Sequence, residues 1–363
     1  LYIMVKKMIY LDNSATTRVA GCAAAKINQI NTEIYANPSS LHNMGLKAEE
    51  ERESARKTIA KSISANPKNI IFTSGGTEAN NLAISGYLLR NRHAGRRIIT
   101  SAAEHASVFS VFEHFEAQGY EVYYVPYTKQ GGLDYEFLRN SINEDTALVS
   151  IMSVNNETGA IFDTARIKKI ILEKNRNTLF HSDCVQAYMK TRINVKTHGA
   201  DMISLSSHKI NGPKGTGALY VEDYVKLSPL IIGGGQEGNI RSGTENLSGI
   251  CGFAEAAKLN QENNEEKISH IRSLRNELLK RIETLPHIHV NSEEEGAAHI
   301  LNVSFLKLRS EIMLHSLEMK GIYVSSGSAC SSNFKGKKSV LSRMGFEKAI
   351  YDSAIRFSFS YEN

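Results

Sequence analysis

A lysine at the end of a predicted strand has the clearest capacity for chemistry in this chain. The apolar run Asp201–Leu205 predicts a strand, and Lys209 follows it in Ser206-Ser-His-Lys-Ile-Asn-Gly-Pro. A lysine held beside hydroxyls and away from bulk water can lose its proton and form an imine with a carbonyl. The segment therefore predicts that Lys209 forms a Schiff base, although an isolated His-Lys pair in a Gly/Pro turn is more often part of an ordinary surface turn.

Polar side chains also follow other predicted strands. Gly76 and Thr77 follow the predicted strand Ile70–Phe72, at the start of a predicted helix. Backbone N–H groups, the positive end of the helix and the threonine hydroxyl can hold a phosphate there. His105 precedes the helix Ser107–Gln118, where an imidazole can stack on a ring and shuttle protons. A capped turn without a ligand and a histidine that only caps its helix are the ordinary alternatives.

Two further strand ends carry groups that suit a pyridine ring. Asn156 follows one strand with a side-chain amide, and Asp183 and Gln186 follow the next. Asp183 can keep a pyridine nitrogen protonated and make the ring an electron sink, or it can simply cap the next helix. Because ligands of parallel sheets bind at the carboxyl ends of the strands, these groups can meet around one ligand. Together they predict pyridoxal 5′-phosphate as the cofactor.

A thiol in a polar loop is the second candidate for chemistry. The four cysteines include no Cys-x-x-Cys pair and are expected to be free thiols in a reducing compartment. Cys330 lies in a Gly/Ser-rich loop, Ser325–Asn333, which suits a thiol that must be reached and must move. Cys184 competes with it, but the adjacent aspartate disfavours a thiolate. Cys22 and Cys251 are expected to be buried.

The elements that must position these groups alternate along much of the chain. Strand-length apolar runs are mostly separated by stretches of helical period, which predicts an α/β protein with a mostly parallel sheet covered on both faces. A long charged helix over Ile250–Leu285 follows, and the pattern after it predicts a small α+β domain. The predicted domains are a large one over 18–255 and a small one formed by 1–17 and 256–363.

Composition excludes several classes of function. The 43 basic and 38 acidic side chains give a net charge of +5 that is spread along the chain, which gives no case for direct nucleic-acid binding. No apolar run approaches the ~20 residues that span a bilayer, so no membrane association is expected. With no signal-peptide pattern at its start, the chain is expected to be cytoplasmic.

In combination, these motifs resemble the pyridoxal-phosphate cysteine desulfurases of the NifS/IscS type, a class-V aminotransferase group with PLP fold type I. The similarity extends from Tyr10-Leu-Asp-Asn-Ser-Ala-Thr-Thr17 to Ile355-Arg-Phe-Ser358 and includes Thr73-Ser-Gly-Gly-Thr-Glu78 and Arg241-Ser-Gly-Thr244. The family usually continues past Arg-Phe-Ser through a helical segment. Either the sequence ends before that segment, or the small domain lacks its last helices.

The resemblance implies a role for each matched residue. Lys209 would be the Schiff-base lysine, and Cys330 would carry a persulfide and be able to ligate an iron–sulfur cluster transiently, with no resident metal. Around these two, the resemblance implies phosphate contacts from Gly76, Thr77, Ser206, His208 and a neighbouring subunit's Thr244, ring contacts from His105, Asn156, Asp183 and Gln186, and substrate-carboxylate contacts from Arg356 and Asn37.

The function implied is conversion of L-cysteine to L-alanine by a homodimer. Sulfur would pass to Cys330 and then to an acceptor protein, such as an iron–sulfur scaffold or a tRNA-thiolation enzyme. Another class-V enzyme, such as an aminotransferase or a selenocysteine lyase, would use the same cofactor without needing Cys330. A non-catalytic sulfur-assembly partner would keep the fold without the imine, but retention of Lys209, Asp183, His105 and Cys330 together argues against it.

Overall fold

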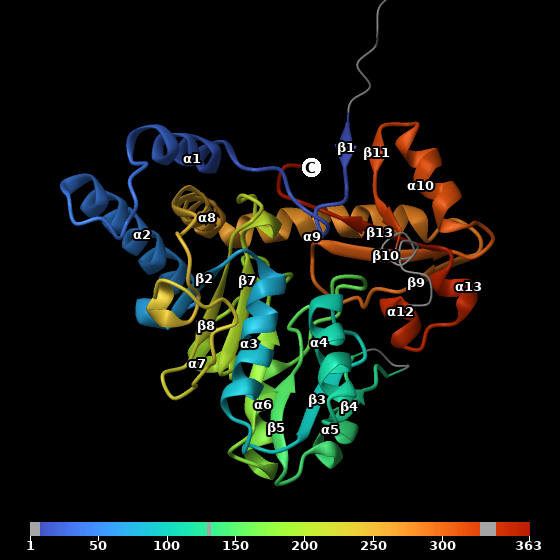
Figure 1. Cartoon of the computed structure of the whole chain (residues 1–363). Coiled ribbons are helices and arrows are strands. Elements are labelled where there is room, and N and C mark those ends of the chain that lie inside the picture. Colours follow the sequence, from blue (N-terminus) through green and yellow to red (C-terminus); the bar gives the residue numbers. More distant parts are fainter. Residues whose placement is uncertain (1–7, 129–131, 327–338) are drawn as a thin grey trace, which may run out of the picture.

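The computed structural model describes residues 8–128, 132–326 and 339–363. Figure 1 labels the elements, whose bounds in chain order are β1 (Ile9–Tyr10), α1 (Gly21–Glu33), α2 (Asn43–Ser62), η1 (Pro67–Asn69), β2 (Ile70–Thr73), α3 (Gly76–Arg90), β3 (Arg97–Ser101), α4 (Ala106–Ala117), β4 (Glu121–Val125), α5 (Tyr135–Ser141), β5 (Thr146–Ser150), α6 (Thr164–Lys174), β6 (Leu179–Asp183), α7 (Val195–His198), β7 (Met202–Ser206), η2 (Ser207–Lys209), β8 (Gly217–Val221), η3 (Glu237–Asn239), α8 (Leu247–Gln261), α9 (Asn264–Ile282), β9 (Ile288–Val290), β10 (Ile300–Phe305), α10 (Ser310–Glu318), β11 (Ile322–Tyr323), β12 (Ser325–Ser326), α12 (Val340–Arg343), α13 (Lys348–Tyr351) and β13 (Ala354–Ser358).

The central sheet is mostly parallel, as the alternation of strands and helices predicts. Its strand order is β2-β8-β7-β6-β5-β3-β4. The pairs from β7 to β4 are parallel, whereas β8 runs antiparallel to both of its neighbours. The carboxyl ends of β5, β6 and β7 therefore lie side by side at one edge of the sheet, which is where polar ligands bind in such folds.

Helices cover both faces of this sheet because its strands are apolar on both sides. Successive side chains of a strand point to opposite faces. Ile98 accordingly packs into one apolar cluster with α3 and α4, while its neighbour Ile99 packs into another with α2, α6 and α8. Figure 1 shows α3 and α4 together on the near face. Burial on both faces makes the strands a rigid support for the loops at their ends.

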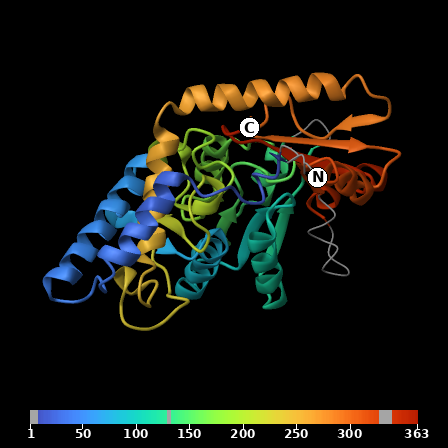
Figure 2. The ribbon, with the colours of Figure 1, turned by 90° about the horizontal axis from the view of Figure 1, so that it is seen from above.

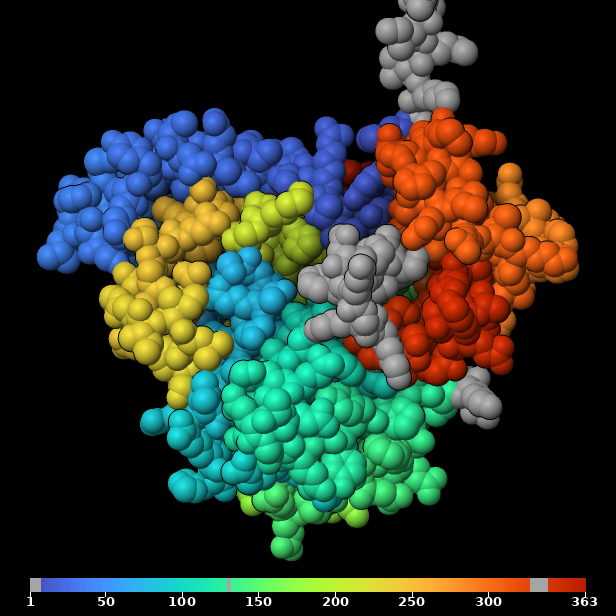
Figure 3. All heavy atoms as spheres, turned by 45° about the vertical axis from the view of Figure 1, so that its right-hand side comes forward, coloured from blue at the N-terminus to red at the C-terminus, as the bar shows by residue number. Residues whose placement is uncertain are grey.

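A smaller antiparallel sheet, in the order β12-β13-β10-β9, forms the C-terminal part of the fold. The helix α9 packs along it, with Ile271 and Ile282 buried against Leu301 and Val303 of β10 (Figure 2). The N-terminal residues join this part, since β1 pairs with β11 and Asp12 bridges to Ser358. Figure 3 shows the blue N-terminal residues against the orange C-terminal ones. The proposed domain limits at 17/18 and 255/256 stay a prediction.

The prediction of one helix over Ile250–Leu285 is wrong. The chain forms two helices there, α8 and α9, and it turns between them at Glu262 and Asn263. Asn263 has φ 51°, in the left-handed region that asparagine enters more readily than most residues. Asn264 then starts α9 and donates from Nδ2 to the carbonyl of Met189, 2.9 Å away. The sequence around the turn, Asn260–Lys267, contains no apolar residue, so the hydrophobic period is interrupted there and the prediction overlooked that signal.

Candidate active site

Lys209 ends a single 3₁₀ turn that directly follows β7 at the carboxyl edge of the central sheet. Its Nζ donates to the carbonyl oxygens of Ser14 and Ala15, at 2.7 Å in the latter case. The N-terminal loop is fixed over this turn, because Thr17 donates from both its N–H and its hydroxyl to the carbonyl of His208. Gly212 is required behind the turn, since a Cβ there would lie 2.1 Å from the hydroxyl oxygen of Ser207.

A chain of hydrogen bonds connects His105 with Asp183. His105 caps α4, and its Nδ1 lies 2.8 Å from the hydroxyl of Ser107. Asn80, on α3, donates from Nδ2 to that hydroxyl at 2.8 Å and to Oδ2 of Asp183 at 2.7 Å. The other carboxylate oxygen of Asp183 accepts from the N–H of Val185 at 2.9 Å. The carboxylate is thus held in one orientation by an amide and a backbone donor.

Burial explains the titration behaviour of the histidines near this edge. Burial lowers the pKa of His105, the positive charge of Lys209 lowers it further, and Asp183 opposes both effects. Burial and the neighbouring lysines also lower the pKa of His208 to about 4. The Nδ1 of His208 lies 3.2 Å from the hydroxyl oxygen of Thr16. Both imidazoles are therefore neutral at pH 7 and can act as proton donors or acceptors without bringing an additional charge.

The start of α3 lies next to the end of β7 and could hold an anion. Gly75 precedes the helix with φ 152°, a conformation open to glycine, and Gly76 is its first residue. A Cβ built on Gly76 would lie 3.7 Å from Cβ of Ser206, so the helix start and the end of β7 are in close proximity. The hydroxyl oxygen of Ser206 is buried and has no hydrogen-bond partner among the described residues. Thr77 is exposed in the same first turn.

Arg356 brings a buried positive charge to the site from the small sheet. On β13, it donates from Nη1 to the carbonyl of Asn156 at 2.8 Å and to Glu157 at 3.1 Å, and from Nη2 to Asp12 at 3.2 Å. The amide oxygen of Asn156 is buried without a hydrogen-bond partner in the described part of the chain. Gln186 donates to the carbonyl of Ser14 at 2.9 Å, which places it at the same loop as Lys209.

Not every predicted site residue joins this cluster. Asn37 is exposed in the connection between α1 and α2, where its side chain accepts from the N–H of Ser39 at 2.9 Å. Figure 1 shows that connection at the left of the view, whereas β13, which carries Arg356, lies to the right of the centre. Thr244 is exposed in a loop outside the sheet edge. One chain alone therefore does not bring Asn37 and Thr244 to the other predicted residues.

The cysteines differ in their placement. Cys330 lies outside the described residues, so its role stays a prediction. Cys184 is fully buried, and burial raises the pKa of its thiol to about 12. Cys251 is also buried, as expected, with its pKa likewise raised by burial to about 12. The expectation that Cys22 is buried is wrong: it lies at the start of α1, where its side chain points to solvent.

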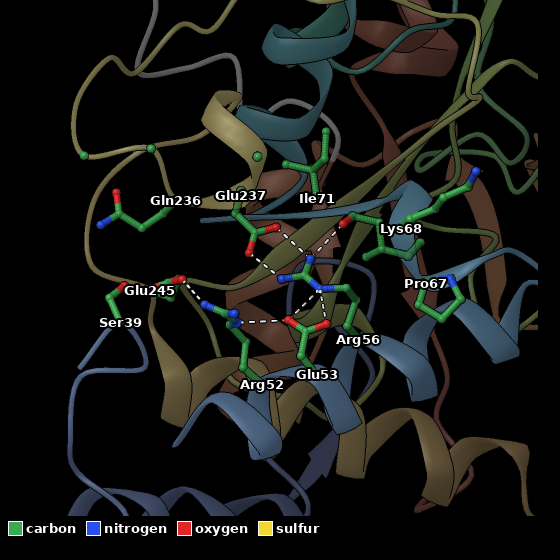
Figure 4. A pocket seen from close by; sticks show the side chains of 14 residues that line it. Ser39, Arg52, Glu53, Arg56, Pro67, Lys68, Ile71, Gln236, Glu237 and Glu245 are labelled. Carbon is green, nitrogen blue, oxygen red and sulfur yellow. Dashed lines mark hydrogen bonds and ion pairs between the residues drawn. The ribbon is translucent and has the colours of Figure 1, made fainter. Parts of the chain in front are cut away.

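A network of ion pairs fixes the loop that carries Thr244 (Figure 4). Arg56 binds Glu237 through two nitrogens, at 2.8 and 2.7 Å, and Arg52 contacts Glu245 at 2.5 Å. Glu237 also accepts from the N–H of Phe72 at 2.8 Å. These side chains line a cavity of about 520 Å³ between α2 and the loop. The cavity is separate from the Lys209 cluster, and its polar groups mostly bind one another.

Removing Arg56 is expected to destabilise the protein strongly. The Glu237 side chain is only 2% exposed, so Arg56→Ala leaves a buried carboxylate without its cation. Breaking a buried pair in this way costs about 3–5 kcal/mol of the free energy of unfolding. Urea unfolding followed by circular dichroism measures the loss. The control is Arg139→Ala, since the Arg139–Glu173 pair is exposed and screened by solvent, so its loss is expected to change the free energy of unfolding far less. Equal losses of the free energy of unfolding in the two variants would contradict the conclusion that Arg56 compensates a buried charge.

Sequence reasoning missed three residues that the structure places in or next to the cluster. Asn80 connects Asp183 with Ser107, although it reads as one polar residue of an amphipathic helix. Glu104 is fully buried beside His105, and burial raises its pKa to about 8. Lys190 has a buried Nζ near Lys209. The proximity of Glu104 to His105 in the sequence was a usable signal, whereas nothing local marks Asn80 or Lys190.

Two classes of site are not found. In the part of the chain that the structure describes, no helix is both long and apolar enough to cross a bilayer. Among the same residues, no three His, Cys, Asp or Glu side chains gather into an arrangement that could hold a metal ion.

Comparison with known proteins identifies the family. The class-V aminotransferase family model matches residues 9–363. A NifS/IcsS protein homolog of Lactobacillus delbrueckii subsp. bulgaricus is 42% identical, covering 98% of this chain and 93% of the relative. Cysteine desulfurase IscS of Methanosarcina thermophila is 40% identical, covering 98% and 88%. A solved NifS-like protein superposes with a TM-score of 0.93 at 36% identity, covering 98% and 94%. The chain therefore belongs to the class-V aminotransferase family, and within it to the cysteine desulfurases.

Proposed function

We propose that this cysteine desulfurase converts L-cysteine to L-alanine on pyridoxal phosphate bound through Lys209, with sulfur passing to Cys330. The observation that carries the proposal is the convergence of an amine, a fixed carboxylate, a neutral imidazole and an anion cup at one edge of the sheet. Incubation with pyridoxal phosphate and L-cysteine tests it by chromatographic assay of alanine and a measurement of sulfide released by added thiol. One alanine for each sulfur is expected, and release of sulfide without alanine would contradict the proposal.

The residues present fit this cofactor. The buried hydroxyl of Ser206 lacks a partner beside the glycine start of α3, which suits a phosphate oxygen held by backbone N–H groups and the helix start. Asp183 can hold a pyridine nitrogen protonated, since Asn80 and Val185 fix its carboxylate. Gly76, Thr77, Ser206 and His208 would hold the phosphate. When bound, pyridoxal phosphate supplies an electron-withdrawing ring that stabilises negative charge at the carbon from which a proton is removed.

The residues around the ring have separate tasks. Lys209 would bind the carbonyl of the cofactor and, once released by the substrate amine, take the proton from the substrate Cα. The carbonyls of Ser14 and Ala15 orient that amine. His105 would lie against the ring, oriented by Ser107, while Asn156 and Gln186 would bind the ring oxygen. A neutral His105 can transfer a proton without adding a second positive charge next to Lys209.

The thiolate of Cys330 would receive the sulfur. Attack on the substrate sulfur forms an S–S bond and breaks the substrate Cβ–S bond, which leaves a persulfide on Cys330 and alanine after protonation. The sequence supports this role through the polar Gly/Ser loop around Cys330. An exposed carrier can present its sulfur to an acceptor protein, for which we propose an iron–sulfur scaffold or a tRNA-thiolation enzyme. We place the enzyme in the cytoplasm as a homodimer, in which Thr244 of one subunit reaches the phosphate of the other.

Arg356 would bind the substrate carboxylate, and replacing it should weaken binding of amino acids selectively. Arg356→Lys keeps the charge but loses the planar pair of donors, so affinity for L-alanine is expected to fall about 10- to 100-fold. Absorbance titration of the cofactor-loaded protein measures the dissociation constant. Ethylamine, which has no carboxylate, serves as the control ligand and should bind both proteins equally well. Equal losses for the two ligands would show that Arg356 supports the structure without binding the carboxylate.

A further inference from the structure

Lys190 is a buried lysine for which the reaction described above has no use. It ends the turn that follows β6, where its N–H donates to the carbonyl of Ala187 at 3.0 Å. Its Nζ is buried and has no hydrogen-bond partner among the described residues. An unpaired ammonium in such a place costs several kcal/mol, so the amine is held neutral unless its charge is otherwise compensated.

A small cavity connects Lys190 with Lys209. The cavity has a volume of about 30 Å³, and both lysines line it together with Lys267 and Tyr361. A volume of this size holds roughly one or two water molecules. Of the other two lysines, Lys209 donates to Ser14 and Ala15, while Lys267 donates to the carbonyl of Leu259 and lies 5.0 Å from the centre of the Tyr361 ring. Lys190 thus lines the same small cavity as Lys209.

The charged groups around Lys190 are mainly positive. Burial and the charge of Lys209 lower the pKa of Lys190 to about 7. Burial lowers the pKa of both His299 and His208, and the charge of Lys190 lowers both further. Of the neighbouring carboxylates, Asp12 pairs with Arg356 and also interacts with the charge of Lys209, while Asp183 accepts from Asn80 and Val185. Positive charge on either lysine disfavours protonation of the other, so the two amines titrate as a pair.

We propose that Lys190 and Lys209 share a single proton, and that Lys190 is a positioning residue that holds the positive charge whenever Lys209 must be a neutral amine. In the protein without cofactor, the carbonyls of Ser14 and Ala15 favour the charged form of Lys209, and that charge disfavours protonation of Lys190. Once the Lys209 nitrogen is bonded to a carbonyl carbon, it is less basic than a free amine. The shared proton then resides on Lys190. When the substrate releases Lys209, the charge on Lys190 keeps the freed amine unprotonated and able to take the Cα proton. The role rests on the proposed function of Lys209.

The absorbance of the cofactor-loaded protein tests the coupling without measuring turnover. The absorbance of the bound cofactor changes with pH, and the midpoint of that change is the quantity measured. Lys190→Met removes the charge from a buried position, so this midpoint is expected to rise by about one pH unit or more. Lys190→Arg keeps a positive charge and should leave the midpoint at or below that of the wild type. Lys267→Met lines the same cavity but removes an amine with its own partners, so it should move the midpoint little. An unchanged midpoint in Lys190→Met would overturn the inference.

A measurement without cofactor separates this inference from the proposed function. In protein labelled with ¹³C at lysine Cε, the Lys190 resonance, assigned by its absence from Lys190→Met, reports its titration. We expect a midpoint near neutrality that rises by about one pH unit or more in Lys209→Ala, because the neighbouring charge is gone. If the Lys190 midpoint is the same in Lys209→Ala as in the wild type, the inference is overturned, even if the protein binds pyridoxal phosphate. Failure to bind the cofactor, with the coupling intact, would instead count against the proposed function.

Discussion

Lys209→Ala is expected to abolish alanine formation, with a loss of at least about 10³-fold, because in the proposed mechanism one side chain supplies both the covalent attachment and the base. The variant should also lose the cofactor's visible absorbance band, since no other lysine follows β7 at the same position. The fold should persist, because Lys209 contributes hydrogen bonds to Ser14 and Ala15 but no part of the apolar core. Activity assays and absorbance spectra of the purified protein measure both losses.

The control for this variant is in the same turn. Lys214 is exposed five residues further along and is not within the cluster, so Lys214→Ala should keep both the band and the activity. If Lys209→Ala formed alanine at more than about a tenth of the wild-type rate, the assignment of the attachment lysine would be wrong.

Cys330→Ser is expected to stop sulfur transfer while leaving cofactor and substrate binding intact. A serine hydroxyl is far less acidic and less nucleophilic towards sulfur than a thiolate, so turnover should fall at least about 10³-fold. The absorbance change on addition of L-cysteine should still occur, because binding depends on Lys209 and Arg356. Mass mapping of peptides after a single turnover should find the additional sulfur on Cys330 in the wild type and nowhere in the variant.

The other cysteines provide matched controls. Cys184 and Cys251 are buried with pKa values of about 12, because burial disfavours the thiolate, so Cys184→Ala and Cys251→Ala should keep sulfur transfer. Cys22→Ser tests the exposed thiol at the start of α1 and should also be active. Several turnovers by Cys330→Ser would instead favour a class-V enzyme that does not use a cysteine carrier, such as a selenocysteine lyase.

The central sheet, and the gathering of several candidate residues at one of its edges, could be predicted from the sequence because both follow from local patterns. Strand-length apolar runs separated by helices leave few alternatives to a parallel sheet, and polar groups at strand ends must then share one edge. Lys209, Asp183, His105, Gly76 and Ser206 each lie at the carboxyl end of such a strand or within four residues of it. The structure brings these five to the same edge of the central sheet.

Long-range contacts are what the sequence did not predict. Nothing in the pattern near Ser14 indicates that its carbonyl receives the amine of Lys209, 195 residues further along. The turn at Asn263 depends on one left-handed residue, although the polar run Asn260–Lys267 around it was a usable signal. Lys190 is a single lysine beyond a strand end, and only the tertiary fold brings it to the same cavity as Lys209.

The central claim is that Lys209 binds pyridoxal phosphate covalently at the sheet edge. Reduction of the cofactor-loaded protein with borohydride, followed by proteolysis and mass spectrometry, traps and locates that attachment. The account predicts a phosphopyridoxyl group on the peptide that contains Lys209 and on no other lysine. Attachment at Lys190 or at any other lysine, or no attachment at all, would contradict it.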